Sequence, residues 1–231
     1  MTTIREFADG AALAEGFAEW SVDILRAAIA ARGMALLIVS GGSTPKRYFT
    51  ALSARDLDWS RVAVTLADER RVPDDSPRSN ARLVRETLLQ NKAAKAQFCP
   101  LANSRLGSGQ ELAAAAARVA QLPLPADLAV LGMGDDGHTA SWFPHAPGLA
   151  EALDPAARAL VSAMAAPDGL EPRLTLTGRA LLRARALALQ IEGPAKAAVF
   201  ARAQGEGPVA DMPIRAVLRG AADRLTVFKA A

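Results

Sequence analysis

The sequence predicts an α/β protein with a doubly wound, mostly parallel sheet flanked by helices, a Rossmann-like arrangement in three αβα layers. Short apolar runs alternate with helical patterns along all 231 residues, and three of these runs end in glycine-rich or charged loops. Runs that are apolar at every position are typical of strands covered on both faces. The sequence has no internal repeat and no low-complexity linker, so we expect a single domain over residues 1–231.

The N-terminal segment gives the first strand and helices of this pattern. Large apolar residues recur at helical spacing between residues 9 and 32, and Gly33 closes that helix. Residues 35–39 (ALLIV) then predict a short buried strand, which ends in the loop 40–46. This order of strand, glycine loop and helix is repeated further along the chain.

The later elements follow the same order. Residues 61–67 (RVAVTLA) predict a strand that enters a charged loop at 68–73, and Ser79 is expected to cap a helix extending to Gln90. Residues 110–121 contain five consecutive alanines and predict another helix. The remaining expectations are a strand at 128–131 before the loop 132–138, strands near 158–162, 173–177, 186–192 and 225–229, helices near 178–184, 194–203 and 213–219, and a short antiparallel excursion around 155–177.

Composition excludes several classes of protein. The net charge of +3 comes from 22 arginines and five lysines scattered along the chain, so the basic stripe that nucleic acid requires is absent. Arginine binds phosphate and carboxylate groups, which leaves a small anionic substrate open. Cys99 is the single cysteine, and the sequence has neither a secretory leader nor an apolar run of about 18 residues. We therefore expect a cytoplasmic protein without membrane partners.

Three loops carry most of the distinctive chemistry, at residues 40–46, 68–73 and 132–138. Ligands in open parallel sheets bind at the carboxyl ends of the strands, where these loops are expected to converge. In the first loop, two glycines allow an anion to approach the backbone, and hydroxyl and N–H groups at a helix N-terminus donate to it. The alternative is an ordinary turn from strand to helix that needs glycine and a cap.

The loop at 68–73 places four charged residues directly after a strand. Arg70 could hold a phosphate or a carbonyl oxygen, and Asp68 could take protons or orient hydroxyls. The alternative is a solvated turn with local ion pairs. Further along the chain, Lys196 opens a helix after the strand at 186–192 and is either a second anion anchor or a solvated lysine.

The loop GMGDDGH at 132–138 formally fits the dinucleotide pattern GxGxxG, but its two carboxylates stand where a pyrophosphate would lie. A neighbouring carboxylate could instead fix the tautomer of His138 and make it a general base, although a structural histidine is the alternative. His145 is interpreted as a surface or packing residue. No HExxH motif or cysteine set is present, so we expect no metal, and without a GxSxG elbow a covalent role for Ser43 with His138 is a weak alternative.

Taken together, these motifs resemble the 6-phosphogluconolactonase family, within the glucosamine-6-phosphate deaminase and ribose-5-phosphate isomerase-like superfamily. Several long motifs in the family's order make the resemblance specific and spread it over most of the chain. The matching stretches are SGGSTPKRYFTAL at 40–52, LADERRVPDDSPRSN at 66–80, DLAVLGMGDDGHTASWFP at 127–144, RLTLT at 173–177 and IEGPAKAAVF at 191–200.

The resemblance implies a carboxylic ester hydrolase that opens 6-phospho-D-glucono-1,5-lactone to 6-phospho-D-gluconate in the oxidative pentose phosphate pathway, without a cofactor. It implies that His138 activates water and that Asp68 and Asp136 orient groups or relay protons. It also implies a monomer or weak homo-oligomer that binds a sugar phosphate lactone. The residues implied for binding phosphate or sugar hydroxyls are Gly41, Gly42, Ser43, Thr44, Arg70, Arg173 and Lys196.

Two other functions are weighed against this one. The amino-sugar phosphate deaminases of the superfamily have the pattern DGHIAFNEP, whereas the stretch here is DGHTASWFP, which lacks the further acidic residue that ring opening needs. A non-catalytic sugar-phosphate-binding regulator would keep the glycine loop but has no need of the DDGH loop. The chain also departs from the family at Arg78, where an altered pairing at the cleft rim is expected, and at Trp142.

Overall fold

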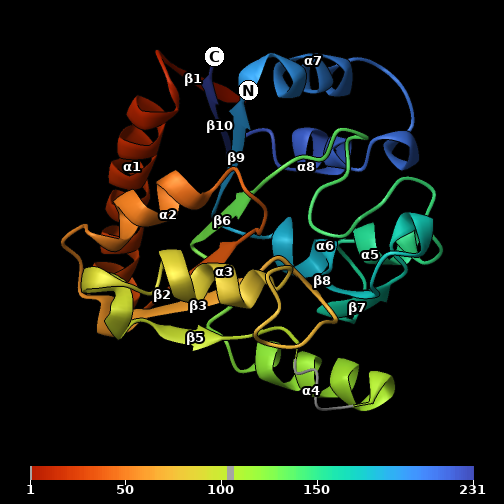
Figure 1. Ribbon diagram of the computed structural model, residues 1–231, viewed down its shortest axis with the longest axis horizontal. Helices are drawn as coiled ribbons and strands as arrows, with labels where there is room; N and C mark the ends of the chain where they lie inside the picture. Colours follow the sequence, from red (N-terminus) through yellow and green to blue (C-terminus); the bar gives the residue numbers. More distant parts are fainter. Residues whose placement is uncertain (1, 103–106) are drawn as a thin grey trace.

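The computed structural model describes residues 2–102 and 107–231, and they form an α/β fold with two sheets (Figure 1). The larger sheet has seven parallel strands in the order β1-β10-β9-β6-β2-β3-β5. Their bounds, in that order, are Thr3–Phe7, Leu225–Ala230, Ala186–Glu192, Leu128–Leu131, Ala35–Val39, Val62–Leu66 and Gln97–Cys99. The predicted doubly wound, mostly parallel fold is thereby confirmed.

A smaller antiparallel sheet has the order β4-β8-β7. Its strands are Asp68–Arg70, Arg173–Leu176 and Val161–Met164. In Figure 1, β7 and β8 lie to the right of β2 and β3. The antiparallel excursion expected around 155–177 is confirmed, and its third strand comes from the charged segment that follows β3.

Eight helices are found in the described part of the chain. They are α1 (Gly10–Arg32), α2 (Lys46–Ser53), α3 (Asn80–Thr87), α4 (Ser108–Ala120), α5 (Leu149–Leu153), α6 (Gly178–Leu181), α7 (Gly193–Gln204) and α8 (Ile214–Gly220). None of these helices has the length and hydropathy needed to cross a membrane.

The central strands are buried because helices cover both faces of the large sheet. Every residue of β2, β3 and β6 is buried, as expected from their continuous apolar runs. Helix α1 packs across β2, β6 and β10. Its ends are where the sequence predicts them, because the Asp9 side chain accepts from two backbone N–H groups at the start and Gly33 adopts a left-handed φ of 79° at the end.

Several elements differ from the prediction. The segment predicted as a charged loop begins with β4. This strand pairs with β8, and its side chains point alternately to the two sides, with Asp68 and Glu69 both buried. Strands β1 and β5 and helix α5 were not predicted, since they are only three to five residues long and β1 is an exposed edge strand. Helix α3 begins after Ser79 as predicted but ends at Thr87 rather than Gln90.

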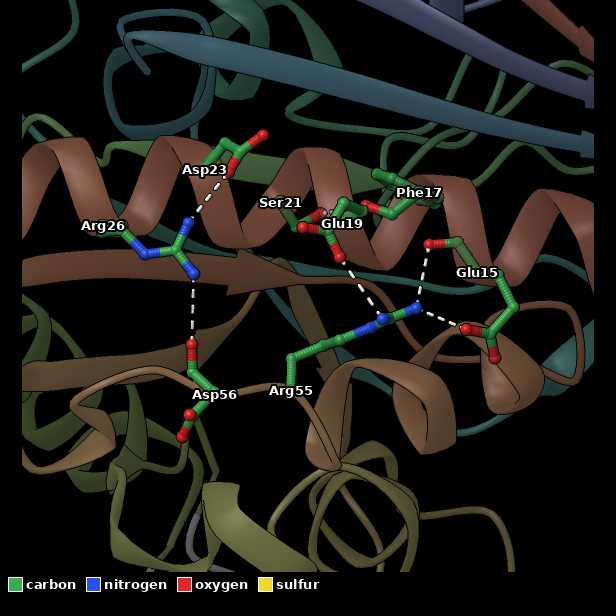
Figure 2. A network of polar contacts seen from close by, with 8 residues as sticks. All are labelled: Glu15, Phe17, Glu19, Ser21, Asp23, Arg26, Arg55 and Asp56. Atoms are coloured by element: carbon green, nitrogen blue, oxygen red, sulfur yellow. Dashed lines mark hydrogen bonds and ion pairs between the residues drawn. The ribbon is translucent and has the colours of Figure 1, made fainter.

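Helix α2 carries the glycine loop at its N-terminus, and ion pairs attach the residues after its other end to α1 (Figure 2). The Arg55 guanidinium contacts Glu15 and lies 3.3 Å from the Glu19 carboxylate. Arg26 donates to the backbone carbonyl of Asp56 at 3.2 Å and also pairs with Asp23. These contacts fix the direction in which α2 presents its N-terminus.

The C-terminal helices support the loop at 132–138. The Ile214 N–H at the start of α8 donates to the Gly137 carbonyl at 2.9 Å. In the next residue, the buried Arg215 guanidinium donates to four backbone carbonyls at and beyond the end of α7. Two of these carbonyls, those of Arg202 and Ala203, belong to the last turn of α7 and carry the negative end of its dipole, which stabilises a buried cation that has no carboxylate partner among the described residues.

We expect Arg215→Met to lower the free energy of unfolding by about 2–4 kcal/mol, since it leaves buried carbonyl groups without donors. Urea denaturation measures this change. Arg219→Met is the matched control, because Arg219 lies on the same helix and donates to two carbonyls but is exposed. Equal losses in the two variants would contradict a special role for the buried guanidinium.

Candidate active site

A cleft of about 360 Å³ lies at the carboxyl ends of β2, β6 and β9 and beside the smaller sheet. The three loops that the sequence singled out all contribute to its lining. Every residue predicted for catalysis or binding borders this one cleft, which brings together Gly41, Gly42, Ser43, Thr44, Asp68, Arg70, Asp136, His138, Arg173 and Lys196. Their chemical roles stay predictions, which the geometry below supports to different degrees.

His138 and Asp136 form a hydrogen-bonded pair. The His138 Nδ1 atom lies 2.6 Å from Asp136 Oδ1, and the His138 backbone N–H donates to the same oxygen at 3.0 Å. Burial alone would raise the pKa of Asp136, but the hydrogen bonds from His138 outweigh it and lower the pKa. An ionised Asp136 keeps the proton of the neutral imidazole on Nδ1, which leaves the Nε2 lone pair available as a base.

Two glycines of this loop, Gly134 and Gly137, stand where a side chain would not fit. A Cβ atom on Gly134 would lie 2.1 Å from His138 Nδ1 and 2.7 Å from Asp136 Oδ1. Gly137 has a φ of 83° and packs against Met212, so a side chain there is excluded twice over. The glycine pattern that resembles a dinucleotide motif therefore serves the placement of His138.

Asp68 is buried at the cleft wall, where Ser141 Oγ donates to its Oδ2 at 2.6 Å. The Asn80 amide donates to the Asp68 backbone carbonyl at 2.9 Å. Asn80 also explains why residue 41 in the loop 40–46 is a glycine, because a Cβ on Gly41 would lie 1.8 Å from Asn80 Oδ1. Gly42 adopts a φ of 98°, which L-residues rarely tolerate.

Two guanidinium groups form a cationic wall, defined here as Arg70 and Arg173. They are register partners in the antiparallel pairing of β4 and β8. Burial, and then the charge of Arg70, lower the pKa of Arg173. Arg70 Nε is buried without a hydrogen-bond partner among the described residues. A pair of close cations with donors to spare favours an anionic ligand such as phosphate.

Lys196 borders the cleft from α7, where its Nζ donates to Asp135 Oδ1 at 2.7 Å. This hydrogen bond and the lysine charge lower the pKa of Asp135. The lysine charge is thus partly neutralised. His145 lies outside the cleft lining, is largely exposed and pairs with Asp211 at 3.1 Å, in keeping with its interpretation as a surface residue.

The structure adds cleft residues that sequence reasoning missed. Gln190 and Ser40 line the floor, and each has a buried polar atom without a partner among the described residues. Gln190 was detectable as the one polar residue inside the apolar strand ALALQIE. Asn80 and Phe143 also line the cleft, and the Phe143 ring lies 5.0 Å from that of His138 and 5.7 Å from the Arg173 guanidinium.

The two departures from the family pattern have clear positions. Arg78 pairs with Glu171 at the rim. A hydrogen bond from the Glu171 backbone, and then the Arg78 guanidinium, lower the pKa of the Glu171 carboxyl. Trp142 is fully buried, and its indole N–H donates to the Leu176 carbonyl at 3.0 Å. Trp142 therefore joins the loop after His138 to the smaller sheet.

A histidine–carboxylate pair beside a cationic wall, at the carboxyl edge of a parallel sheet, is the arrangement of an α/β enzyme that acts on a small anionic substrate. The model of the family "Glucosamine-6-phosphate isomerases/6-phosphogluconolactonase" matches residues 8–227. The chain belongs to this family.

Its relatives within the family include lactonases of several bacteria. A 6-phosphogluconolactonase of Rhizobium meliloti is 51% identical over 222 residues, which cover 96% of both chains. One of Mesorhizobium japonicum is 49% identical and covers 96% of this chain and 92% of its own. The crystal structure of a 6-phosphogluconolactonase from Shewanella baltica has a TM-score of 0.94 at 42% identity and covers 100% of this chain and 98% of the other.

We expect Gly134→Ala to displace the His138 ring and lower kcat by about 10²-fold, the effect of a misplacement of about 1 Å. Imidazole NMR spectra check the cause, because the chain has only two histidines. The His138 signals should shift while those of His145 stay fixed as an internal reference. Unchanged His138 signals together with full activity would show that the loop tolerates a side chain at this position.

Proposed function

We propose that this chain opens 6-phospho-D-glucono-1,5-lactone to 6-phospho-D-gluconate with a water molecule that His138 activates. The reaction class follows from the relatives of 42–51% identity, which are 6-phosphogluconolactonases of nearly the same length. The chain is accordingly a carboxylic ester hydrolase of the oxidative pentose phosphate pathway. The observation that carries the proposed mechanism is the His138–Asp136 pair, which faces the same cleft as the cationic wall.

The proposed chemistry balances without any further reactant. His138 Nε2 takes a proton from water as the water oxygen forms a bond to the C1 carbonyl carbon. The bond between C1 and the ring oxygen then breaks, and the proton on His138 passes to that oxygen, which becomes a hydroxyl. That transfer returns the histidine to its neutral form, and the carboxylic acid product loses its own proton to solvent. An ester-like carbonyl needs only a positioned water, a base and stabilisation of the developing oxyanion, so we expect no cofactor.

The other cleft residues have supporting roles in this proposal. Asp136 holds the His138 tautomer, and Asp68, fixed by Ser141, orients a sugar hydroxyl or relays a proton. The glycine loop, with Ser43 and Thr44, offers hydroxyl and N–H donors to the substrate. We assign the phosphate first to Arg70, whose Nε has no hydrogen-bond partner in the described part of the chain, together with its neighbour Arg173.

Amino-sugar phosphate isomerisation is the alternative, because the family also includes glucosamine-6-phosphate isomerases. The acidic side chains of the described residues that border the cleft are Asp68 and Asp136. The stretch after His138 contributes Phe143 to the cleft and buries Trp142, so it offers no further carboxylate for ring opening. Lactone hydrolysis is therefore the better supported reaction.

Covalent catalysis by Ser43 has little support, because within the described residues no hydrogen bond joins the Ser43 hydroxyl to His138. We also propose a cytoplasmic location for a single-domain chain, on the strength of its metabolic role and lone cysteine. We further propose that the active form is a monomer or a weak homo-oligomer.

We expect His138→Ala to lower kcat by about 10²–10⁴-fold with little change in KM, because the phosphate contacts remain. The assay uses freshly generated 6-phosphogluconolactone and subtracts spontaneous opening. His145→Ala is the matched control and should keep full activity. Turnover on glucosamine 6-phosphate, with no acceleration of lactone opening, would overturn the proposed function.

We expect Arg70→Gln to raise KM for the phosphorylated lactone by about 10–100-fold, since a hydrogen bond to a charged group is lost. KM for unphosphorylated glucono-1,5-lactone should stay the same. Lys196→Gln should have the smaller effect, because Asp135 already pairs with that lysine. If parallel measurements show a larger increase in KM for Lys196→Gln than for Arg70→Gln, the phosphate is assigned to Lys196 instead.

A further inference from the structure

Two surface segments meet at the rim above the cationic wall, residues 73–79 before α3 and residues 167–172 before β8. Their side chains are joined by Arg78 and Glu171. Arg78 Nε lies 2.5 Å from Glu171 Oε1, and Arg78 Nη2 donates to Oε2 at 2.8 Å. Two parallel contacts between a guanidinium and a carboxylate fix the orientation of the groups as well as their separation. We call this bidentate pair the rim clasp.

Each residue of the rim clasp also holds one arginine of the cationic wall through its backbone. Arg70 Nη1 donates to the Arg78 carbonyl oxygen at 2.6 Å. Arg173 Nε donates to the Glu171 carbonyl oxygen at 3.0 Å. The side chains therefore connect the two segments, while the carbonyl groups of the same two residues fix the two guanidinium groups.

The wall needs such a support because it brings like charges together. Arg70 and Arg173 are paired in register and are buried or half-buried, so the repulsion between them is strong, although the carboxylates of Asp68 and Glu171 act against it at Arg173. Below them, the Arg71 N–H donates to the Pro172 carbonyl at 2.9 Å and closes the base of the arrangement. At the rim, the ion pair of Arg78 and Glu171 performs the same task through side chains.

We infer that the rim clasp is a positioning device, which sets the separation of Arg70 and Arg173 and so determines how strongly the cleft prefers a phosphorylated over an unphosphorylated lactone. The inference rests on the proposed function, since it concerns the anionic end of that substrate. Arg78 and Glu171 lie outside the cleft lining and act through the wall. His138 is held by its own loop, so the clasp governs KM rather than kcat.

A simpler role for Arg78 would be to attract the anionic substrate by its charge. The two roles predict opposite effects of neutralising Glu171. If Arg78 acts only as a charge, Arg78→Gln weakens binding and Glu171→Gln strengthens it. If the clasp positions the wall, both substitutions weaken binding, because either one releases the two segments.

The experiment measures kcat and KM for 6-phosphogluconolactone and for glucono-1,5-lactone in Arg78→Gln, Glu171→Gln and the exchanged double variant Arg78→Glu with Glu171→Arg. We expect each single variant to raise KM for the phosphorylated lactone by about three- to tenfold, with kcat unchanged. KM for the unphosphorylated lactone should not change. The double variant should regain most of the loss, because it rebuilds an ion pair between the same segments.

Arg61→Gln is the matched control, because Arg61 is another exposed arginine paired with a carboxylate, Asp58, outside the cleft. It should leave all constants unchanged, and thermal unfolding checks that every variant folds. Three outcomes would each overturn the inference. They are a lower KM in Glu171→Gln, a fall in kcat at constant KM in either single variant, and a KM increase in the double variant as large as the two single increases combined.

A separate arm distinguishes failure of this inference from failure of the proposed function. Calorimetric titration with 6-phospho-D-gluconate and with D-gluconate needs no turnover. If the wild-type chain does not accelerate lactone opening, the proposed function fails, and the titration still tests the clasp. The clasp then requires both single variants to lose affinity for the phosphorylated acid alone, and equal affinities in wild type and variants would reject it.

Discussion

The candidate site depends on one buried carboxylate, that of Glu69. It accepts hydrogen bonds from the backbone N–H groups of Arg70, Asn80 and Ala81 and from the Ser79 hydroxyl. Burial raises the pKa of Glu69, while the hydrogen bonds from the three backbone N–H groups oppose the shift. The N-terminus of α3 attracts this negative group, and the interaction fixes the helix onto the middle residue of β4.

Side chains alternate in direction along β4, so the contact between Glu69 and α3 determines which side chains face the cleft. With Glu69 directed at α3, its neighbours Asp68 and Arg70 both border the cleft. The same attachment places Asn80, which contacts the backbone of Asp68 and excludes a side chain at Gly41. One buried interaction thereby brings a carboxylate, a guanidinium and the glycine loop to the same wall.

The sequence was sufficient to predict the parallel sheet, the helix caps at Ser79 and Gly33, and ten of the residues that border the cleft, of which Arg173 was named through the family resemblance alone. Continuous apolar runs and loops that follow them depend on local chemistry, which a single sequence displays. Strand β4 was not predicted, because four charged residues in a row are typical of a solvent-exposed loop. Glu69 can be buried there because hydrogen-bond donors ten to twelve residues further along the chain satisfy its carboxylate. The partner of Arg78 is Glu171, 93 positions further along the chain, and no local pattern connects the two.

The two sheets divide the proposed chemistry between them. The large sheet ends in the loop that fixes His138, whose tautomer depends on Asp136 two residues away. The smaller sheet carries the cationic wall, which depends on the pairing of β4 with β8 and on the contact between Arg78 and Glu171, both of which join distant segments. Trp142 connects the two, because it follows the histidine loop and donates to the last residue of β8. The separation between a proton-transfer group and an anion site is thus set by how the two sheets pack.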